Sequence, residues 1–201
     1  MPTRRVLVWR GLDGWRAEIA RVRLDGDRLT ADGRQIGVEP LAYELEYKLE
    51  TRPRFVTSSL VVSARGDGWI RSLSLRRPEE GKWHIDAEHE GAAPLESPGG
   101  DVASFAEALD CDLAMCPLTN TMPVLREALL EGGEARDFVM AWVKVPDLAV
   151  YRSEQRYEPV SERTVRYVGK SSGFVAELEL DGDGLVVRYP ELAERLYPPA
   201  A

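Results

Sequence analysis

Hydrophobic and polar residues alternate along much of the chain, a pattern typical of β-strands that have one buried face. In the clearest case, residues 42–49, every second side chain is large and apolar, and mostly charged residues occupy the positions between. Further strands are expected over residues 55–65, 69–75, 81–86, 138–145, 148–157, 163–168, 173–180 and 185–189. Turns rich in Gly and Asp at 66–68 and 181–184 join neighbouring strands. The predicted fold class is therefore mainly β, with antiparallel hairpins.

The first predicted hairpin turns at residues 25–27, which read Asp-Gly-Asp. Before this turn the alternation contains a slip of one residue near Ala20, which predicts a β-bulge and places Glu18 on the polar face. After it, a short return strand is expected to end at a second turn, Asp32-Gly33.

A segment of different character, residues 110–126, separates the two strand-rich parts of the chain; we call it the central segment. It combines cysteines, carboxylates, an amide, hydroxyls and prolines among apolar residues. Pro117 and Pro123 exclude both a continuous helix and a central strand, so residues 116–123 are predicted to be irregular. The short polar side chains there can form hydrogen bonds with nearby backbone amides, which gives a turn that needs no other partner. Alternatively, they can face a ligand.

Two short helices are predicted beside these strands. The first runs from Pro123 to Leu130, with Thr121 as a capping residue and Gly132-Gly133 as a stop. The second runs from Pro190 to Leu196 and closes the chain.

The chain has 201 residues, which suits a single domain, residues 1–201, with a real hydrophobic core. Residues 47–86 and 157–189 share a loose strand, strand, turn, strand order, which suggests two related halves, 1–109 and 110–201. Nothing in the pattern indicates an oligomeric state.

The net charge and the hydropathy of the chain argue against nucleic acid as a partner and against a membrane span. The net charge of −8 repels phosphate backbones, so nucleic acid is not an expected partner. No apolar run approaches the roughly 20 residues of a membrane span. The N-terminal apolar run is also shorter than the roughly 7 to 15 residues of a signal-peptide core, so a cytoplasmic location is expected.

The chain contains no standard catalytic or cofactor motif, and no cofactor is expected. Cys111 and Cys116 have neither redox nor zinc spacing, and we expect both to be reduced, buried thiols. His84, Asp86 and Glu88 share one strand face, but their spacing matches no zinc pattern. We interpret them as a solvated face and expect no metal site.

The central segment also carries a family resemblance. Its Thr119-Asn120-Thr121 core, two residues before Pro123, is followed downstream by the Trp142 strand and by Gln155-Arg156-Tyr157. Together with Trp9 and the strand at residues 81–83, these motifs resemble the bacterial family called putative glycolipid-binding over nearly the whole chain. The resemblance implies a fold similar to lipoprotein carriers, with a curved, incompletely closed antiparallel barrel.

The resemblance and the residue pattern together predict non-catalytic binding of an amphipathic ligand, such as a glycolipid, in a cavity of the curved sheet. Polar anchors are expected in the central segment and aromatic lining on the strands. The candidate ligand-binding residues are Asn120, Thr119, Thr121, Arg126, Trp83, Trp142, Gln155 and Tyr157.

Two other functions stay open. The first is a hydrolase that acts on such a ligand with Asp110 and Asp112 as acid and base, since both fall on one strand face. The second is an interaction module that pairs with a partner through an open sheet edge. For Arg126 an alternative to ligand binding also stays open: it can pair with Asp110 or Asp112 and simply hold the central segment.

Overall fold

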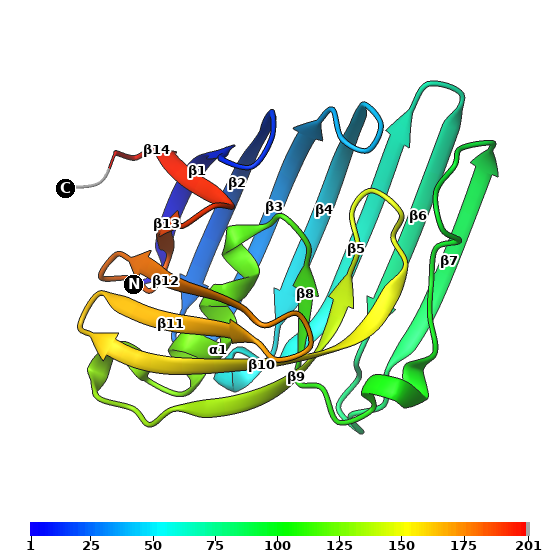
Figure 1. Cartoon of the computed structure of the whole chain (residues 1–201). Coiled ribbons are helices and arrows are strands. Elements are labelled where there is room, and N and C mark those ends of the chain that lie inside the picture. Colours follow the sequence, from blue (N-terminus) through cyan, green and yellow to red (C-terminus); the bar gives the residue numbers. More distant parts are fainter. Residues whose placement is uncertain (200–201) are drawn as a thin grey trace.

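The computed structural model describes residues 1–199, and most of them form a single sheet of fourteen strands (Figure 1). The order across the sheet is β7-β6-β5-β4-β3-β2-β1-β14-β13-β12-β11-β10-β9-β8. The strands are β1 (Thr3–Gly11), β2 (Arg16–Asp25), β3 (Arg28–Gly37), β4 (Tyr43–Thr51), β5 (Thr57–Gly66), β6 (Trp69–Arg76), β7 (His84–Gly91), β8 (Asp110–Leu113), β9 (Arg136–Val143), β10 (Val150–Ser161), β11 (Thr164–Gly169), β12 (Phe174–Leu180), β13 (Val186–Tyr189) and β14 (Ala193–Tyr197). All neighbours pair antiparallel except β8 and β9, which pair parallel.

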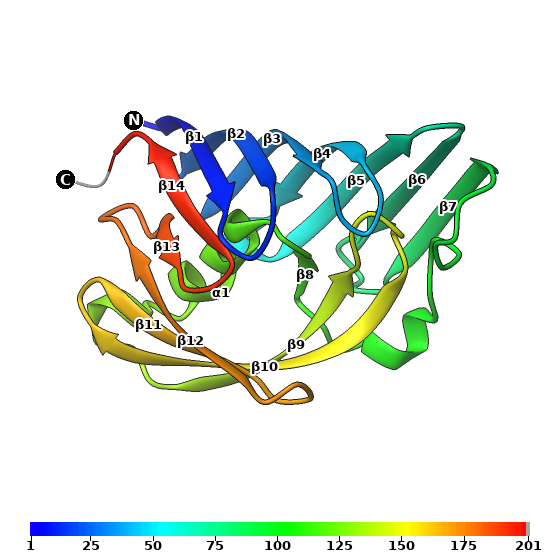
Figure 2. The ribbon, with the colours of Figure 1, turned by 45° about the horizontal axis from the view of Figure 1, so that its top comes forward.

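The sheet curves strongly but does not close. Strands β1 to β7 form one wall and β9 to β12 curve beneath it, with β8 between the two walls (Figure 2). The backbone of β8 is tied to the start of β5, because the Thr57 N–H donates to Leu109 O and the Thr57 hydroxyl accepts from the Cys111 N–H. The predicted curved, incompletely closed antiparallel fold is therefore confirmed.

Helical structure is scarce. α1 (Thr121–Arg126) begins two residues before the predicted helix and ends four residues earlier. A 3₁₀ turn, Leu129–Glu131, follows only after Ala128, whose left-handed backbone (φ 50°) interrupts the helix. Among residues 1–199, no helix has the length and hydrophobicity that crossing a membrane requires.

The predicted helix from Pro190 to Leu196 is wrong. Residues 193–197 form β14, which pairs with β1 on one side and β13 on the other. Ala193 and Arg195 are buried in the alternating manner of a strand, and Arg195 donates to Asp181 at 2.6 Å. Pairing with two strands satisfies the backbone of this segment, and this tertiary gain outweighs its local helix propensity.

The first hairpin also differs from expectation. β2 and β3 pair over ten residues each without a register shift, so neither the bulge near Ala20 nor the turn at Asp32-Gly33 exists. A Cβ on Gly33 would lie 2.3 Å from Tyr47 Cζ. Gly33 therefore makes room for the Tyr47 ring inside a strand, instead of forming a turn.

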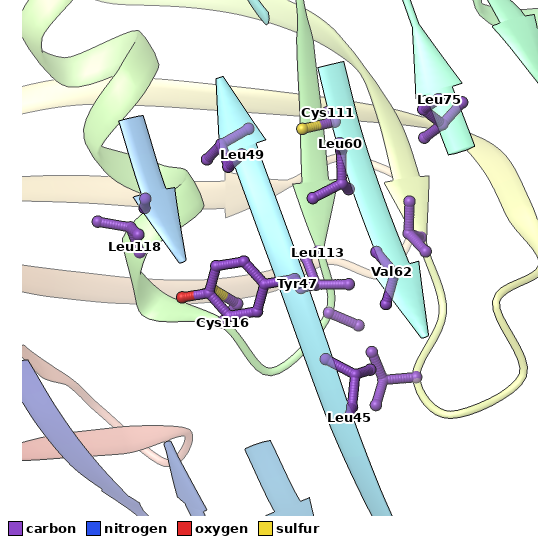
Figure 3. Close-up of a cluster of buried hydrophobic side chains, with 14 of the residues drawn as sticks. Leu45, Tyr47, Leu49, Leu60, Val62, Leu75, Cys111, Leu113, Cys116 and Leu118 are labelled. Atoms are coloured by element: carbon purple, nitrogen blue, oxygen red, sulfur yellow. The ribbon is translucent and has the colours of Figure 1, made fainter. Parts of the chain in front are cut away.

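The main core fills the space between the curved wall and the central segment. Figure 3 shows side chains of β4 and β5 meeting β8 and the residues that follow it. The labelled members are Leu45, Tyr47, Leu49, Leu60, Val62, Leu75, Cys111, Leu113, Cys116 and Leu118, all nearly inaccessible to solvent. Burial of one such aliphatic side chain stabilises the fold by about 1.5–3 kcal/mol, so the central segment is an integral layer of the fold.

Candidate functional site

A pocket of about 480 Å³ lies between the central segment and strands β9 to β13. We call it the aromatic pocket, because five aromatic residues line it: Trp142, Tyr151, Tyr167, Phe174 and Tyr189. Its other lining residues are Asp112, Leu113, Ala114, Met115, Cys116, Asn120, Arg152, Ser153, Glu154, Gly169, Ser171, Ser172 and Leu192. A larger hollow of about 680 Å³ lies beside α1, and none of the described residues that line it is aromatic. The aromatic pocket is thus the better match to an amphipathic ligand.

Asp112 is the polar centre of this pocket. The alternation of β8 turns Cys111 and Leu113 into the main core and Asp112 toward the opposite wall. Its Oδ1 accepts from the Thr119 hydroxyl at 2.9 Å and its Oδ2 from Gln155 Nε2 at 2.7 Å. Burial raises the pKa of the Asp112 carboxyl above its usual range, and no arginine or lysine among residues 1–199 pairs with it.

A second layer of hydrogen bonds fixes Asn120. The Tyr157 hydroxyl lies 2.8 Å from Asn120 Oδ1 and 3.1 Å from Gln155 Oε1, and Asn120 Nδ2 donates to Pro117 O at 3.2 Å. Tyr157 is only 1% exposed. The polar wall of the pocket is therefore held rigidly from behind before any ligand arrives.

Asp110 lies on the same face of β8 but has a different environment. Arg126 Nη1 and Nη2 bond its two carboxylate oxygens at 2.6 and 2.5 Å, and both side chains are 1% exposed. The Arg126 guanidinium also stacks over the Phe138 ring at 5.4 Å. Arg126 thus holds the end of α1 against β8, and neither member of the pair lines the aromatic pocket.

Behind the pocket lies a buried hydrogen-bonded cluster around one carboxylate, Glu18, which the sequence pattern did not predict. Glu18 is 3% exposed and accepts from the Tyr47 hydroxyl at 2.7 Å, from Gln35 Nε2 at 3.0 Å and from Cys116 Sγ at 3.2 Å. Burial raises the pKa of Glu18 to about 7. Cys116 lines the aromatic pocket, so this cluster connects the pocket wall to the centre of β2.

The alternation of hydrophobic and polar residues in β2 already indicated that Glu18 is buried. The inward face of β2 contains Ala20 and Val22, and a strict period of two places Glu18 on that face as well. Assuming a bulge allowed the charged residue to be assigned to the solvent. A buried carboxylate needs donors from other strands, and the sequence pattern does not show that Gln35 and Tyr47 lie opposite.

Comparison with known proteins identifies the family. A family model described as "Putative glycolipid-binding" matches residues 6–195. The chain belongs to this family. A crystal structure of a DUF1089 family protein from Pseudomonas aeruginosa has a similar fold, with a TM-score of 0.68 and 25% identity over 89% of this chain and 92% of that one. No curated protein sequence matches the chain.

For this member of the family described as putative glycolipid-binding, the structure brings five of the candidate residues to one place. Asn120 and Trp142 line the aromatic pocket. Thr119, Gln155 and Tyr157 stand behind the lining and hold Asp112 and Asn120 in position.

The other three candidates lie away from the aromatic pocket. Thr121 and Trp83 belong to the interior, where Trp83 Nε1 donates to Ala108 O at 3.0 Å. Arg126 is occupied by Asp110, as the alternative pairing predicted. These residues support the fold around the site, and the structure gives them no contact with the pocket.

Both cysteines are free and buried, as predicted. Burial raises the pKa of Cys111 to about 12 and that of Cys116 well above its usual value. A thiol with such a pKa is almost wholly protonated at neutral pH, so neither cysteine has the character of a nucleophile.

Proposed function

We propose that the protein binds an amphipathic ligand with a sugar head group in the aromatic pocket and does not transform it. One observation carries the proposal: the Asp112 carboxylate, which has no cationic partner among residues 1–199, stands in a wall that is otherwise mainly aromatic and apolar. The family description points to the same class of ligand.

The chemistry of the wall suits a sugar. Each Asp112 oxygen accepts one internal hydrogen bond and has a further lone pair, and carboxylates bond strongly to donors such as ligand hydroxyls. The rings of Tyr167, Phe174 and Tyr189 pack with centroids 5.8–6.2 Å apart and offer apolar faces. Polar fixation beside apolar burial is what a sugar attached to an alkyl chain requires.

Binding is favoured over hydrolysis by the state of Asp110. Glycoside hydrolysis commonly needs two carboxyl groups that flank the scissile bond. Asp110 is engaged on both oxygens by Arg126 and is 1% exposed, so it is not available beside Asp112. The pair that the hydrolase hypothesis used is thereby reduced to one carboxylate.

We expect the purified protein to bind dodecyl β-glucoside below its critical micelle concentration, and Asp112→Asn to weaken this binding about tenfold. The substitution keeps the shape of the side chain but removes the charge that strengthens hydrogen bonds to the sugar. Trp142→Ala removes apolar lining and should weaken binding to a similar degree. Isothermal titration calorimetry measures both effects.

The matched control is Val175→Ala, on the outward face of β12, where the side chain is 54% exposed. This variant should bind like the wild type. Wild-type affinity in both Asp112→Asn and Trp142→Ala would show that the ligand binds elsewhere, and the proposal would fall.

A further inference from the structure

The β1–β2 and β3–β4 loops project from one end of the sheet (Figures 1 and 2). A further hollow lies between these loops and shares a lining residue with the aromatic pocket. Its volume is about 280 Å³, and we call it the loop hollow. It is lined by Asp13, Gly14, Trp15, Arg16, Gly37, Val38, Glu39, Pro40, Tyr43, Met115 and Val145. Two loops of one wall therefore face the central segment and the β9–β10 connection.

Met115 lines both the loop hollow and the aromatic pocket. It is the one described residue that the two linings share, and its backbone has a left-handed conformation, φ 63°. The unbranched side chain of methionine adapts readily to the shape of its neighbours. A ligand seated at Asp112 thus has a neighbouring site on the far side of one adaptable side chain.

The side chains of the loop hollow have the chemistry of a sugar site. Trp15 is 64% exposed, an unusual state for so large an aromatic surface. Arg16 is only 9% exposed on its side chain, pairs with Asp13 at 3.0 Å and donates to Leu192 O at 2.8 Å, so it is fixed in the wall. Glu39 and the phenol of Tyr43 complete the polar lining.

The charges exclude an anionic group. Asp13 and Glu39 supply two carboxylates against the one guanidinium of Arg16, so a phosphate or sulfate in the hollow would be repelled. A neutral polyol fits this lining, because each of its hydroxyl groups can donate a hydrogen bond to a carboxylate and accept one from the guanidinium. The exposed Trp15 ring offers a flat apolar face for the C–H side of the same sugar.

We propose that the loop hollow is a second sugar subsite, which takes the terminal sugar of a ligand whose head group contains at least two sugars. This inference rests on the proposed function, because the first sugar must occupy the aromatic pocket at Asp112. The head group then crosses Met115, and its outer sugar stacks on Trp15 and bonds Asp13, Arg16 and Glu39.

The test compares two probes with the same alkyl chain, dodecyl β-glucoside and dodecyl β-maltoside, below their critical micelle concentrations. The wild type should bind the maltoside about tenfold more tightly, since the second sugar adds an aromatic contact and hydrogen bonds. Trp15→Ala should reduce this ratio to about one while glucoside affinity stays unchanged. Glu39→Gln, on the exposed side of the hollow, should reduce the ratio about threefold.

The outcomes separate this inference from the proposed function. An equal affinity for both probes in the wild type, or an unchanged ratio in Trp15→Ala, overturns the subsite even where Asp112→Asn still weakens glucoside binding. A uniform loss for both probes in Trp15→Ala would assign Trp15 to the alkyl chain and equally overturn it. Failure of the wild type to bind either probe removes the proposed function together with the subsite.

Discussion

Replacement of Arg126 by methionine is expected to lower the free energy of unfolding by about 3–5 kcal/mol. The two hydrogen bonds of Arg126 to Asp110 are lost, and methionine fills most of the volume without supplying a charge. The Asp110 carboxylate, 1% exposed, is then left without its cationic partner in the interior. Removal of one member of a buried ion pair lowers the stability by far more than the intact pair adds to it, because the remaining charge is left buried without a partner.

Urea unfolding of wild type and variant measures this loss. The matched control is Arg10→Met, which breaks the exposed pair with Glu194 and should change the stability by less than about 1 kcal/mol. The double variant Asp110→Asn/Arg126→Met should recover part of the loss, because no buried charge is left unpaired. A loss in Arg126→Met as small as that in Arg10→Met would contradict a structural role of the buried pair.

Replacement of Glu18 by glutamine is expected to stabilise the protein at pH 8 by about 3 kcal/mol and to have little effect at pH 5. Burial raises the pKa of Glu18 from 4.5 to about 7, so the folded state binds its proton more tightly than the unfolded state. The stability that the protonated group contributes is complete below pH 4.5 and is lost as the pH rises to about 7. Glutamine is neutral at every pH in this range, so the variant keeps this stability as the pH rises.

The hydrogen bonds around Glu18 allow this substitution. Gln35 Oε1 is buried and has no partner among the described residues, so it can accept from the side-chain amide that the substitution introduces, once the Gln35 amide flips. Denaturant unfolding at pH 5 and pH 8 provides the comparison, with Glu46→Gln in the exposed pair with Arg34 as control. An equal effect of Glu18→Gln at both values would show that the buried carboxyl does not titrate in this range.

Period-two alternation and Gly-Asp turns were enough to predict most strands and the fold class. β4, with its strict alternation, and the hairpin of β5 and β6 around Gly66-Asp67-Gly68 lie where the pattern placed them. Errors arose where a residue's local preference differs from its tertiary role. Gly33 was assigned to a turn because glycine is common there, but it lies in a strand where the ring of Tyr47 leaves no room for a larger side chain. Residues 190–196 have helix propensity, but most of them form a strand that pairs with β1.

The site was predicted only in part, because the sequence pattern shows local preferences and not which strands lie opposite each other. The prolines and polar residues of the central segment marked it as unusual, and Asn120, Trp142 and Asp112 do meet in one pocket. The opposite wall was missed, since Tyr167 and Tyr189 belong to strands whose alternation looks ordinary. Alternation shows which face of a strand is inward, but only the order of strands in the sheet shows which inward faces meet.

A crystal structure of the protein with dodecyl β-glucoside tests ligand binding in the aromatic pocket most directly. The sugar is expected in the aromatic pocket, with a hydroxyl within about 3 Å of an Asp112 carboxylate oxygen. The alkyl chain should lie along Trp142, Phe174 and Leu192. A ligand found in the hollow beside α1, or on the outer face of the sheet, with the aromatic pocket free of it, would contradict binding at Asp112.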